Sequence, residues 1–144
     1  ESKTTEIRYS GYKKALKENN LKLNKDLVSI QKDFDRENGY QAAEELIENN
    51  GSIDAIFIYN DVMASGVIDY LNHQKIKIPD EVAVIGYDNS VASYTNPKLT
   101  TVALPKFKMA EKSMQLLFDR IENNSKDNYK KILIHPELII RETT

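Results

Sequence analysis

The chain has 144 residues, of which 40% are hydrophobic and 29% charged, so it has enough apolar material for one globular core and too little for two large domains. Its 20 lysine and arginine residues against 22 aspartate and glutamate residues give a formal net charge of −2, which excludes a global basic field that binds a nucleic-acid backbone. Cysteine is absent, and His73 and His135 are far apart in the sequence, so we expect no disulfide, no metal site and no cofactor, and both histidines at the surface.

The first third of the chain predicts a helix, a short strand and a second helix, over residues 5–19, 27–30 and 40–47. In both helical segments, apolar residues recur at three- and four-residue intervals, which is typical of a helix with one face on a core. Asn49-Asn50-Gly51 follows the second helix and favours its end, because glycine and asparagine tolerate the left-handed conformation found at helix termini.

The middle of the chain continues with a strand, a helix and a strand, over residues 55–59, 62–73 and 82–87. Both strands are apolar throughout, as expected for parallel strands that are covered on both faces. The predicted strand starts at Leu27, Ala55 and Val82 are about 28 residues apart, which is the length of one β-α-β repeat. This spacing predicts an α/β fold in which helices cover both faces of a parallel sheet, a three-layer sandwich.

The last third predicts an extended segment, a long helix, a polar loop and two short strands, over residues 99–102, 105–123, 123–128, 131–134 and 138–141. His135-Pro136 separates the two final strands, and proline is compatible with a bend or a sheet edge at this position.

Polar and aromatic side chains follow each of the three predicted parallel strands, at the edge where such sheets bind ligands. These side chains are Asp33, Phe34 and Asp35 after the first strand, Asn60 and Asp61 after the second, and Tyr87, Asp88 and Asn89 after the third. Carboxylates and amides can bridge adjacent hydroxyls and a flat ring can cover the C–H face of a sugar, so this set favours a polyol or sugar. Each loop alone has another explanation: helix capping at Asn60 and Asp61, a turn at Asp88, and a lid over the core at Phe34.

Enzyme signatures are not found, so no catalytic residue is predicted. The sequence has no glycine-rich phosphate loop, no G-x-S-x-G elbow, and no histidine at a spacing that serves a serine nucleophile. One enzymatic alternative stays open: in a flavodoxin-like fold, Asp33 or Asp35 at a strand end accepts a phosphoryl group with Mg²⁺ held by neighbouring carboxylates.

Several motifs in order resemble the effector-binding core of LacI/GalR-family transcriptional repressors, which has the periplasmic-binding-protein-like type I fold. The motifs are Arg8-Tyr9-Ser10-Gly11-Tyr12, Asp33-Phe34, Gly39-Tyr40, Asn60-Asp61-Val62-Met63-Ala64-Ser65-Gly66, Ile78-Pro79-Asp80-Glu81-Val82-Ala83-Val84-Ile85-Gly86-Tyr87-Asp88-Asn89, Pro97-Lys98-Leu99-Thr100-Thr101-Val102 and Leu138-Ile139-Ile140-Arg141. They extend over nearly the whole chain.

The resemblance implies which side chains bind the effector. Arg8 would grip effector hydroxyls or a carboxylate through its planar fork of donors. Phe34 would stack on the ligand with Asp33 beside it, and Asn60 and Asp88 would hydrogen-bond its hydroxyls. Two further motif residues, Asp61 and Tyr87, are also candidates, with capping or packing as their alternative roles. Leu104 stands where many members place a polar residue near the cleft.

The resemblance also implies lobes and partners. Residues of about 1–103 and 126–144 would form mainly the C-terminal lobe, and residues of about 104–125 would supply a helix of the N-terminal lobe. Because the chain opens on Glu1, we expect a piece of a longer protein, whose helix-turn-helix, hinge, remaining N-terminal lobe and first strand of this lobe lie upstream. Operator DNA would then be bound only through that missing part.

The expected function is that of a cytoplasmic repressor's sensor, which couples a carbohydrate effector to operator affinity. A homodimer is expected, with the exposed face of the helix that carries Met63, Val67 and Tyr70 as its candidate surface and core packing as the alternative for at least one of the three. No membrane contact is expected, since no stretch approaches the roughly 20 apolar residues that span a bilayer. A periplasmic sugar-binding receptor of the same fold is the alternative, and a signal peptide in the complete gene would distinguish it.

Overall fold

A mixed sheet of four strands forms the centre of the computed structural model, which describes residues 3–123 and 130–144. The strands are β1 (Ala55–Phe57), β2 (Ala83–Tyr87), β3 (Thr100–Ala103) and β4 (Glu137–Ile139), and they lie side by side in this order. β1 and β2 are parallel, as the β-α-β spacing predicts. β3 is also parallel to β2, whereas β4 runs antiparallel to β3. The chain therefore has the predicted α/β fold, with an antiparallel strand added at one edge of the sheet.

Two helices, α2 (Arg36–Asn50) and α3 (Asp61–His73), pack against each other, and α3 packs on β2. The core lies between these elements, where burying each large apolar side chain contributes roughly 1.5–3 kcal/mol. Its fully or nearly fully buried members are Ala43, Ile56, Ile58, Met63, Ala64, Val67, Ile68, Tyr70, Leu71, Val82, Val84, Ala92 and Leu99. This core explains the buried Ile56 and Val84, whereas the other face predicted to be covered is more open, with Phe57 42% exposed and Ile85 half-buried.

The predicted helices of the first and middle thirds are confirmed, and their ends have the predicted caps. Helix α1 spans Lys3–Glu18, α2 is capped by Gly51 with a φ of 74°, and α3 begins after Asn60. The Asn60 side-chain oxygen accepts a hydrogen bond from the Met63 backbone amide at 2.8 Å, which satisfies one of the free donors of the first helical turn.

The strand predicted over residues 27–30 is wrong. The chain forms a short 3₁₀ helix at Lys25–Leu27, after which Val28 is extended but belongs to none of the four strands. Extended backbone becomes a strand only beside a partner, and here the side chains of Ser29 and Gln31 instead bond to Glu45 of α2, at 2.9 Å each. The apolar pattern therefore located an extended segment but not a sheet strand.

The C-terminal strands also differ from the prediction. Residues 131–134 are not a strand, and the last strand is Glu137–Ile139 rather than 138–141. The reason is the length of the neighbouring strand, because β3 ends at Ala103, which pairs with Glu137. Residues before Glu137 consequently have no β3 backbone to pair with. The predicted polar loop lies, apart from Asn123, outside the described residues.

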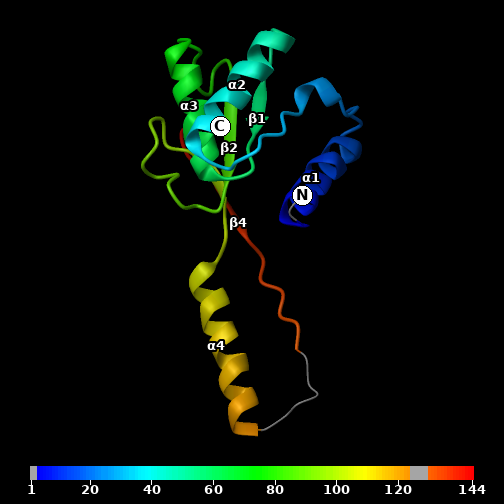
Figure 1. The fold of residues 1–144 in the computed structure, drawn as a ribbon, viewed down its shortest axis with the longest axis vertical. Coiled ribbons are helices and arrows are strands. Elements are labelled where there is room, and N and C mark those ends of the chain that lie inside the picture. The colour runs from blue at the N-terminus through cyan, green and yellow to red at the C-terminus, as the bar shows by residue number, and fades with distance from the viewer. Residues whose placement is uncertain (1–2, 124–129) are drawn as a thin grey trace.

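The predicted long helix is present as α4 (Lys106–Asn123), and it extends away from the sheet (Figure 1). The chain leaves β3, forms α4 and returns into β4. Large apolar side chains on α4 are exposed: Phe107, Met109, Met114, Leu117, Phe118 and Ile121. Over the described ranges 3–123 and 130–144, no helix combines the length and the apolar composition that a membrane crossing requires.

The surface expected for dimerisation is wrong. Met63, Val67 and Tyr70 have relative exposures of 8%, 2% and 2%, because their side of α3 packs into the core. The side of α3 that remains accessible instead carries Val62, which is 37% exposed, and the partly exposed Asp69.

Candidate functional site

Arg8 reaches from α1 to the carboxyl ends of β1 and β2. One terminal nitrogen of its guanidinium donates to Asp88 Oδ1 at 2.9 Å, and the other donates to the backbone carbonyl oxygen of Tyr59. The Arg8 and Asp88 side chains are only 13% and 27% exposed, so this ion pair is partly shielded from water. Two predicted site residues, 80 positions apart in the sequence, are thus brought into direct contact.

Aromatic rings sandwich the Arg8 guanidinium. Its central carbon lies 3.9 Å from the centroid of the Tyr87 ring and 4.5 Å from that of Tyr59. The Phe34 ring stacks on Tyr59 with centroids 4.4 Å apart, and Phe34 itself is 44% exposed. Four flat groups therefore form a continuous stack in the order Tyr87, Arg8, Tyr59, Phe34, held by cation–π and ring contacts.

Tyr59 is a site residue that the sequence analysis did not identify. It ends the apolar run from Ala55, where an aromatic residue is indistinguishable from a core side chain. Its place immediately before Asn60 was the available signal, because the last residue of a parallel strand lies at the ligand edge of the sheet.

Asn60 has a structural role that also places it at the site. Besides capping α3, its side-chain nitrogen donates to the backbone carbonyl oxygen of Phe34 at 3.1 Å. This bond connects the loop after residue 30 to the end of β1. Asn60 therefore helps to set the position of the exposed Phe34 ring.

Asp61, in contrast, is completely buried, with a relative exposure of 0%. Its Oδ1 accepts a hydrogen bond from the Thr101 hydroxyl and its Oδ2 accepts one from the Ser90 backbone amide, both at 2.6 Å. The packing role considered for Asp61 accounts for both of its oxygens, and the first turn of α3 further stabilises its charge.

The two carboxylates near Phe34 differ from each other. Asp33 is exposed beside Phe34 and hydrogen-bonds to none of the other site residues in the described part of the chain. Asp35 caps α2 by accepting from the backbone and side-chain nitrogens of Asn38, at 2.8 and 2.9 Å. The bond from the Asn38 backbone amide holds the pKa of the Asp35 carboxyl below its ordinary value. Capping accounts for Asp35 without the phosphoacceptor chemistry considered above.

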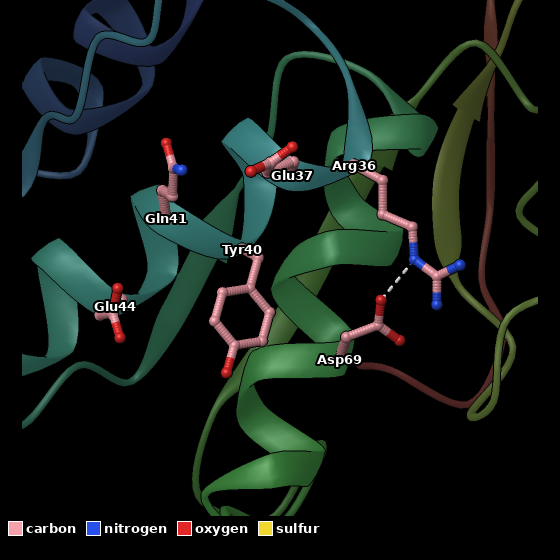
Figure 2. Close-up of a pocket in the computed structure, with 6 residues that line it drawn as sticks. All are labelled: Arg36, Glu37, Tyr40, Gln41, Glu44 and Asp69. Atoms are coloured by element: carbon pink, nitrogen blue, oxygen red, sulfur yellow. Dashed lines mark hydrogen bonds and ion pairs between the residues drawn. The ribbon is translucent and has the colours of Figure 1, made fainter.

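A surface hollow lies elsewhere, along α2 and α3 (Figure 2). It is lined by Arg36, Glu37, Tyr40, Gln41, Glu44 and Asp69. Arg36 and Asp69 form an ion pair that connects the two helices, and all six lining residues belong to α2 or α3 rather than to the strand ends. Within residues 3–123 and 130–144, no group of three or more acidic or histidine side chains is placed to hold a metal ion. The strand-end stack remains the arrangement that suits a polar ligand.

Residues 1–144 match the periplasmic binding protein-like domain. The chain belongs to this family. A curated relative, the HTH-type transcriptional repressor PurR of Histophilus somni (strain 2336), is 38% identical over 143 residues, which are 98% of this chain and 42% of the relative. The solved complex of the transcriptional regulator CelR with cellobiose is 31% identical, with a TM-score of 0.86 over 95% of this chain and 42% of that chain. A LacI family regulator from Lactobacillus casei with bound sucrose is 27% identical, with a TM-score of 0.82 over 97% of this chain and 51% of that one.

These similarities confirm the predicted resemblance to LacI/GalR effector-binding domains and the periplasmic-binding-protein-like fold. The relatives are transcriptional regulators by name. This periplasmic binding protein-like domain spans 42% of the length of its PurR relative.

Proposed function

We propose that this domain senses a small polyhydroxylated molecule, a carbohydrate, for a cytoplasmic transcriptional repressor, and that effector binding changes the affinity of the full-length protein for operator DNA. The observation that carries the proposal is the shielded Arg8–Asp88 pair within a stack of three aromatic rings, at the carboxyl ends of parallel strands. Relatives bound to cellobiose and to sucrose support a carbohydrate ligand. The domain has a binding role in this proposal and no catalytic one.

The chemistry of the site suits neutral hydroxyls. Arg8 offers donors, Asp88 offers acceptors, and the Asn60 amide offers both, so adjacent hydroxyls of a sugar can bridge them. The exposed face of Phe34 can cover the apolar C–H face of a pyranose. Asp33 lies at the rim, where it can accept a bond from a hydroxyl that extends beyond the ring.

The same domain supplies one side of a cleft. We assign residues of about 1–103 and 126–144 to one lobe and those of about 104–125 to the other, because α4 extends from the sheet and exposes an apolar surface. An effector that binds both lobes favours a closed arrangement. Its differential affinity for closed and open states then shifts the population that binds DNA.

A homodimer completes the proposal, with the accessible side of α3 as its surface. A hollow there is lined by Arg36, Val62, Ser65, Ile68, Asp69, Asn72, Val91, Tyr94, Thr95 and Asn96. Tyr94 is 87% exposed beside it, and exposed tyrosine and arginine are the residue types that dominate binding energy at protein interfaces. A two-fold axis near this hollow brings the same patch of two copies together.

The experiment is calorimetric titration of the full-length protein with cellobiose and with sucrose, for the wild type and for Asp88→Ala and Arg8→Ala. Loss of the shielded pair leaves one charge without its partner, so we expect each substitution to weaken binding by about a hundredfold or more. Lys14→Ala on α1 and Asp80→Ala before β2 are the matched controls, since both side chains are exposed and away from the stack. Unchanged affinity in both site variants would refute the assignment.

A further inference from the structure

The turn of residues 88–90, which follows β2, has an unusual backbone. Asp88 has a φ of 98° and Asn89 a φ of 46°, both in the region that non-glycine residues rarely adopt, because Cβ then approaches the backbone. Such angles persist only where the surroundings hold them. Since Asp88 pairs with Arg8 from this turn, the contacts that fix the backbone of the turn also orient the Asp88 carboxylate toward Arg8.

A buried pair of side chains holds the turn from the sheet side. The Asp61 carboxylate accepts from the Ser90 amide and from the Thr101 hydroxyl, at 2.6 Å each, and the Thr101 hydroxyl oxygen accepts from the Asn89 amide at 3.4 Å. Asp61 and Thr101 are both 0% exposed. Gly86 leaves room for this arrangement, because a Cβ at that position would lie 2.5 Å from Asp61 Oδ1.

Arg141 holds the turn from the other side. One terminal nitrogen of its guanidinium donates to the Asn89 side-chain oxygen at 2.9 Å, and the other donates to the Leu99 carbonyl oxygen at 2.7 Å. The Arg141 guanidinium therefore hydrogen-bonds to both ends of the loop 89–99. The Arg141 backbone is itself anchored, since its amide donates to the Thr100 hydroxyl oxygen at 2.8 Å.

We propose that Asp61, Thr101 and Arg141 are positioning residues for the effector site. They hold Asp88 and Asn89 at positive φ, so that Asp88 faces Arg8 before the effector arrives. A site arranged in advance does not spend binding free energy on ordering its own loop. Because the Asp61 and Thr101 side chains are fully buried, they act through Asp88 and not by touching the ligand. This inference rests on the proposed function of the Arg8–Asp88 site.

The test compares Thr101→Val, which keeps the shape and removes the hydroxyl, with Thr101→Ser, which keeps the hydroxyl. Amide hydrogen exchange is measured in the full-length protein at Asn89 and Ser90, and cellobiose and sucrose are titrated by calorimetry on the same samples. In Thr101→Val, we expect exchange at both amides to rise by about tenfold or more and the dissociation constant for the bound sugar to rise by a similar factor. Thr101→Ser should restore both values to within about threefold of the wild type.

Two further variants complete the design. Arg141→Gln removes the guanidinium that bonds to Asn89 and Leu99. Because Arg141 is only half-buried, this variant supplies the same test if Thr101→Val does not fold. Ser113→Ala on α4 is the control, because its hydroxyl donates to the Met109 carbonyl oxygen at 2.8 Å within a helix that extends away from the sheet. Wild-type exchange at Asn89 and Ser90 in both Thr101→Val and Arg141→Gln overturns the inference. The proposed function fails instead if the wild type binds neither sugar or if Asp88→Ala binds sugar normally. In either case, the hydrogen-exchange result still decides whether these residues position the turn.

Discussion

In the proposed effector site, the Arg8–Asp88 pair sets the charge that an effector can carry. Arg8 is the cation of the stack, and Asp88 already neutralises it at 2.9 Å. Asp33 and Asp35, on either side of Phe34, add negative charge at the rim. An anionic ligand must therefore displace Asp88 and approach two further carboxylates, whereas a neutral ligand keeps the pair and bonds to its free donors and acceptors.

This charge balance predicts discrimination against phosphorylated sugars. A phosphate carries about −1.5 to −2 charges at neutral pH, so sucrose 6-phosphate and cellobiose 6-phosphate should bind at least about tenfold more weakly than the parent disaccharides. Calorimetry on the full-length protein with each matched pair measures the ratio. Asp33→Asn should reduce the ratio between the affinities for the parent and the phosphorylated disaccharide, and raising the salt concentration should reduce this ratio as well. Tighter binding of the phosphorylated member would contradict the prediction.

Individual residues show what the sequence can and cannot predict about such a site. The predicted strand ends supplied Phe34, Asn60, Tyr87 and Asp88, the family resemblance added Arg8, and the structure brings these five residues together. An acidic residue at the start of a helix has the same sequence pattern whether it faces a ligand or the interior. For this reason Asp61 was left with two roles, and only its burial and its bonds to Thr101 and Ser90 favour one of them.

At the scale of elements, α2 and α3 approach each other through glycine. A Cβ built on Gly66 would lie 1.9 Å from the carbonyl oxygen of Arg36, and one on Gly39 would lie 2.0 Å from that of Met63. Both obstacles are backbone atoms of the facing helix, so no side-chain movement makes room. This contact brings the helices close enough for Arg36 to pair with Asp69 and for Tyr40 to meet the Tyr70 ring edge-on, with centroids 5.2 Å apart.

The glycine contact predicts a large effect of one methyl group. Gly66→Ala forces α2 and α3 apart and should lower the free energy of unfolding by about 1–3 kcal/mol, the usual cost of overpacking. The control is Gly11→Ala, since nothing lies within 4 Å of a Cβ at that position of α1. Alanine is the better helix former, so this substitution should stabilise by up to about 1 kcal/mol. Urea unfolding of the full-length protein, followed by circular dichroism, gives both values, and equal effects of the two substitutions would be the contrary result.

The sequence correctly predicted α1, α2, α3, α4 and the apolar strands β1 and β2, whose periodicity is local, and the extended segment predicted over residues 99–102 is present as β3. Residues 27–30 and 131–134 failed because a strand depends on a neighbour, which no local pattern contains. Val28 has extended backbone angles, yet its neighbours Ser29 and Gln31 bond to Glu45 rather than to a strand. The face of α3 was misassigned although its sequence carries the signal: Ser65, Asp69 and Asn72 recur at helical spacing on the accessible side, opposite the buried side chains.

At the scale of the whole molecule, the loop 89–99 connects the proposed effector site to the proposed dimer surface. Its first residue is bonded to Arg141 beside Asp88, and Tyr94, at its middle, is 87% exposed next to the accessible side of α3. An exposed tyrosine ring is stabilised by burial of its apolar surface only when another protein surface covers it. The same loop therefore belongs to both the proposed effector site and the proposed dimer surface.

Tyr94→Glu should consequently weaken the dimer of the full-length protein. A carboxylate in the centre of a two-fold interface meets its own copy, and like charges at that distance cost several kcal/mol, so the dissociation constant should rise by about a hundredfold or more. Sedimentation equilibrium measures it, with Tyr12→Glu on α1 as the matched control because that ring lies on another part of the molecule. Effector binding should persist in the monomer, since Arg8 and Asp88 belong to the same chain. An unchanged dimer would instead place the interface on another face, and the exposed apolar side of α4 would then be the next to test.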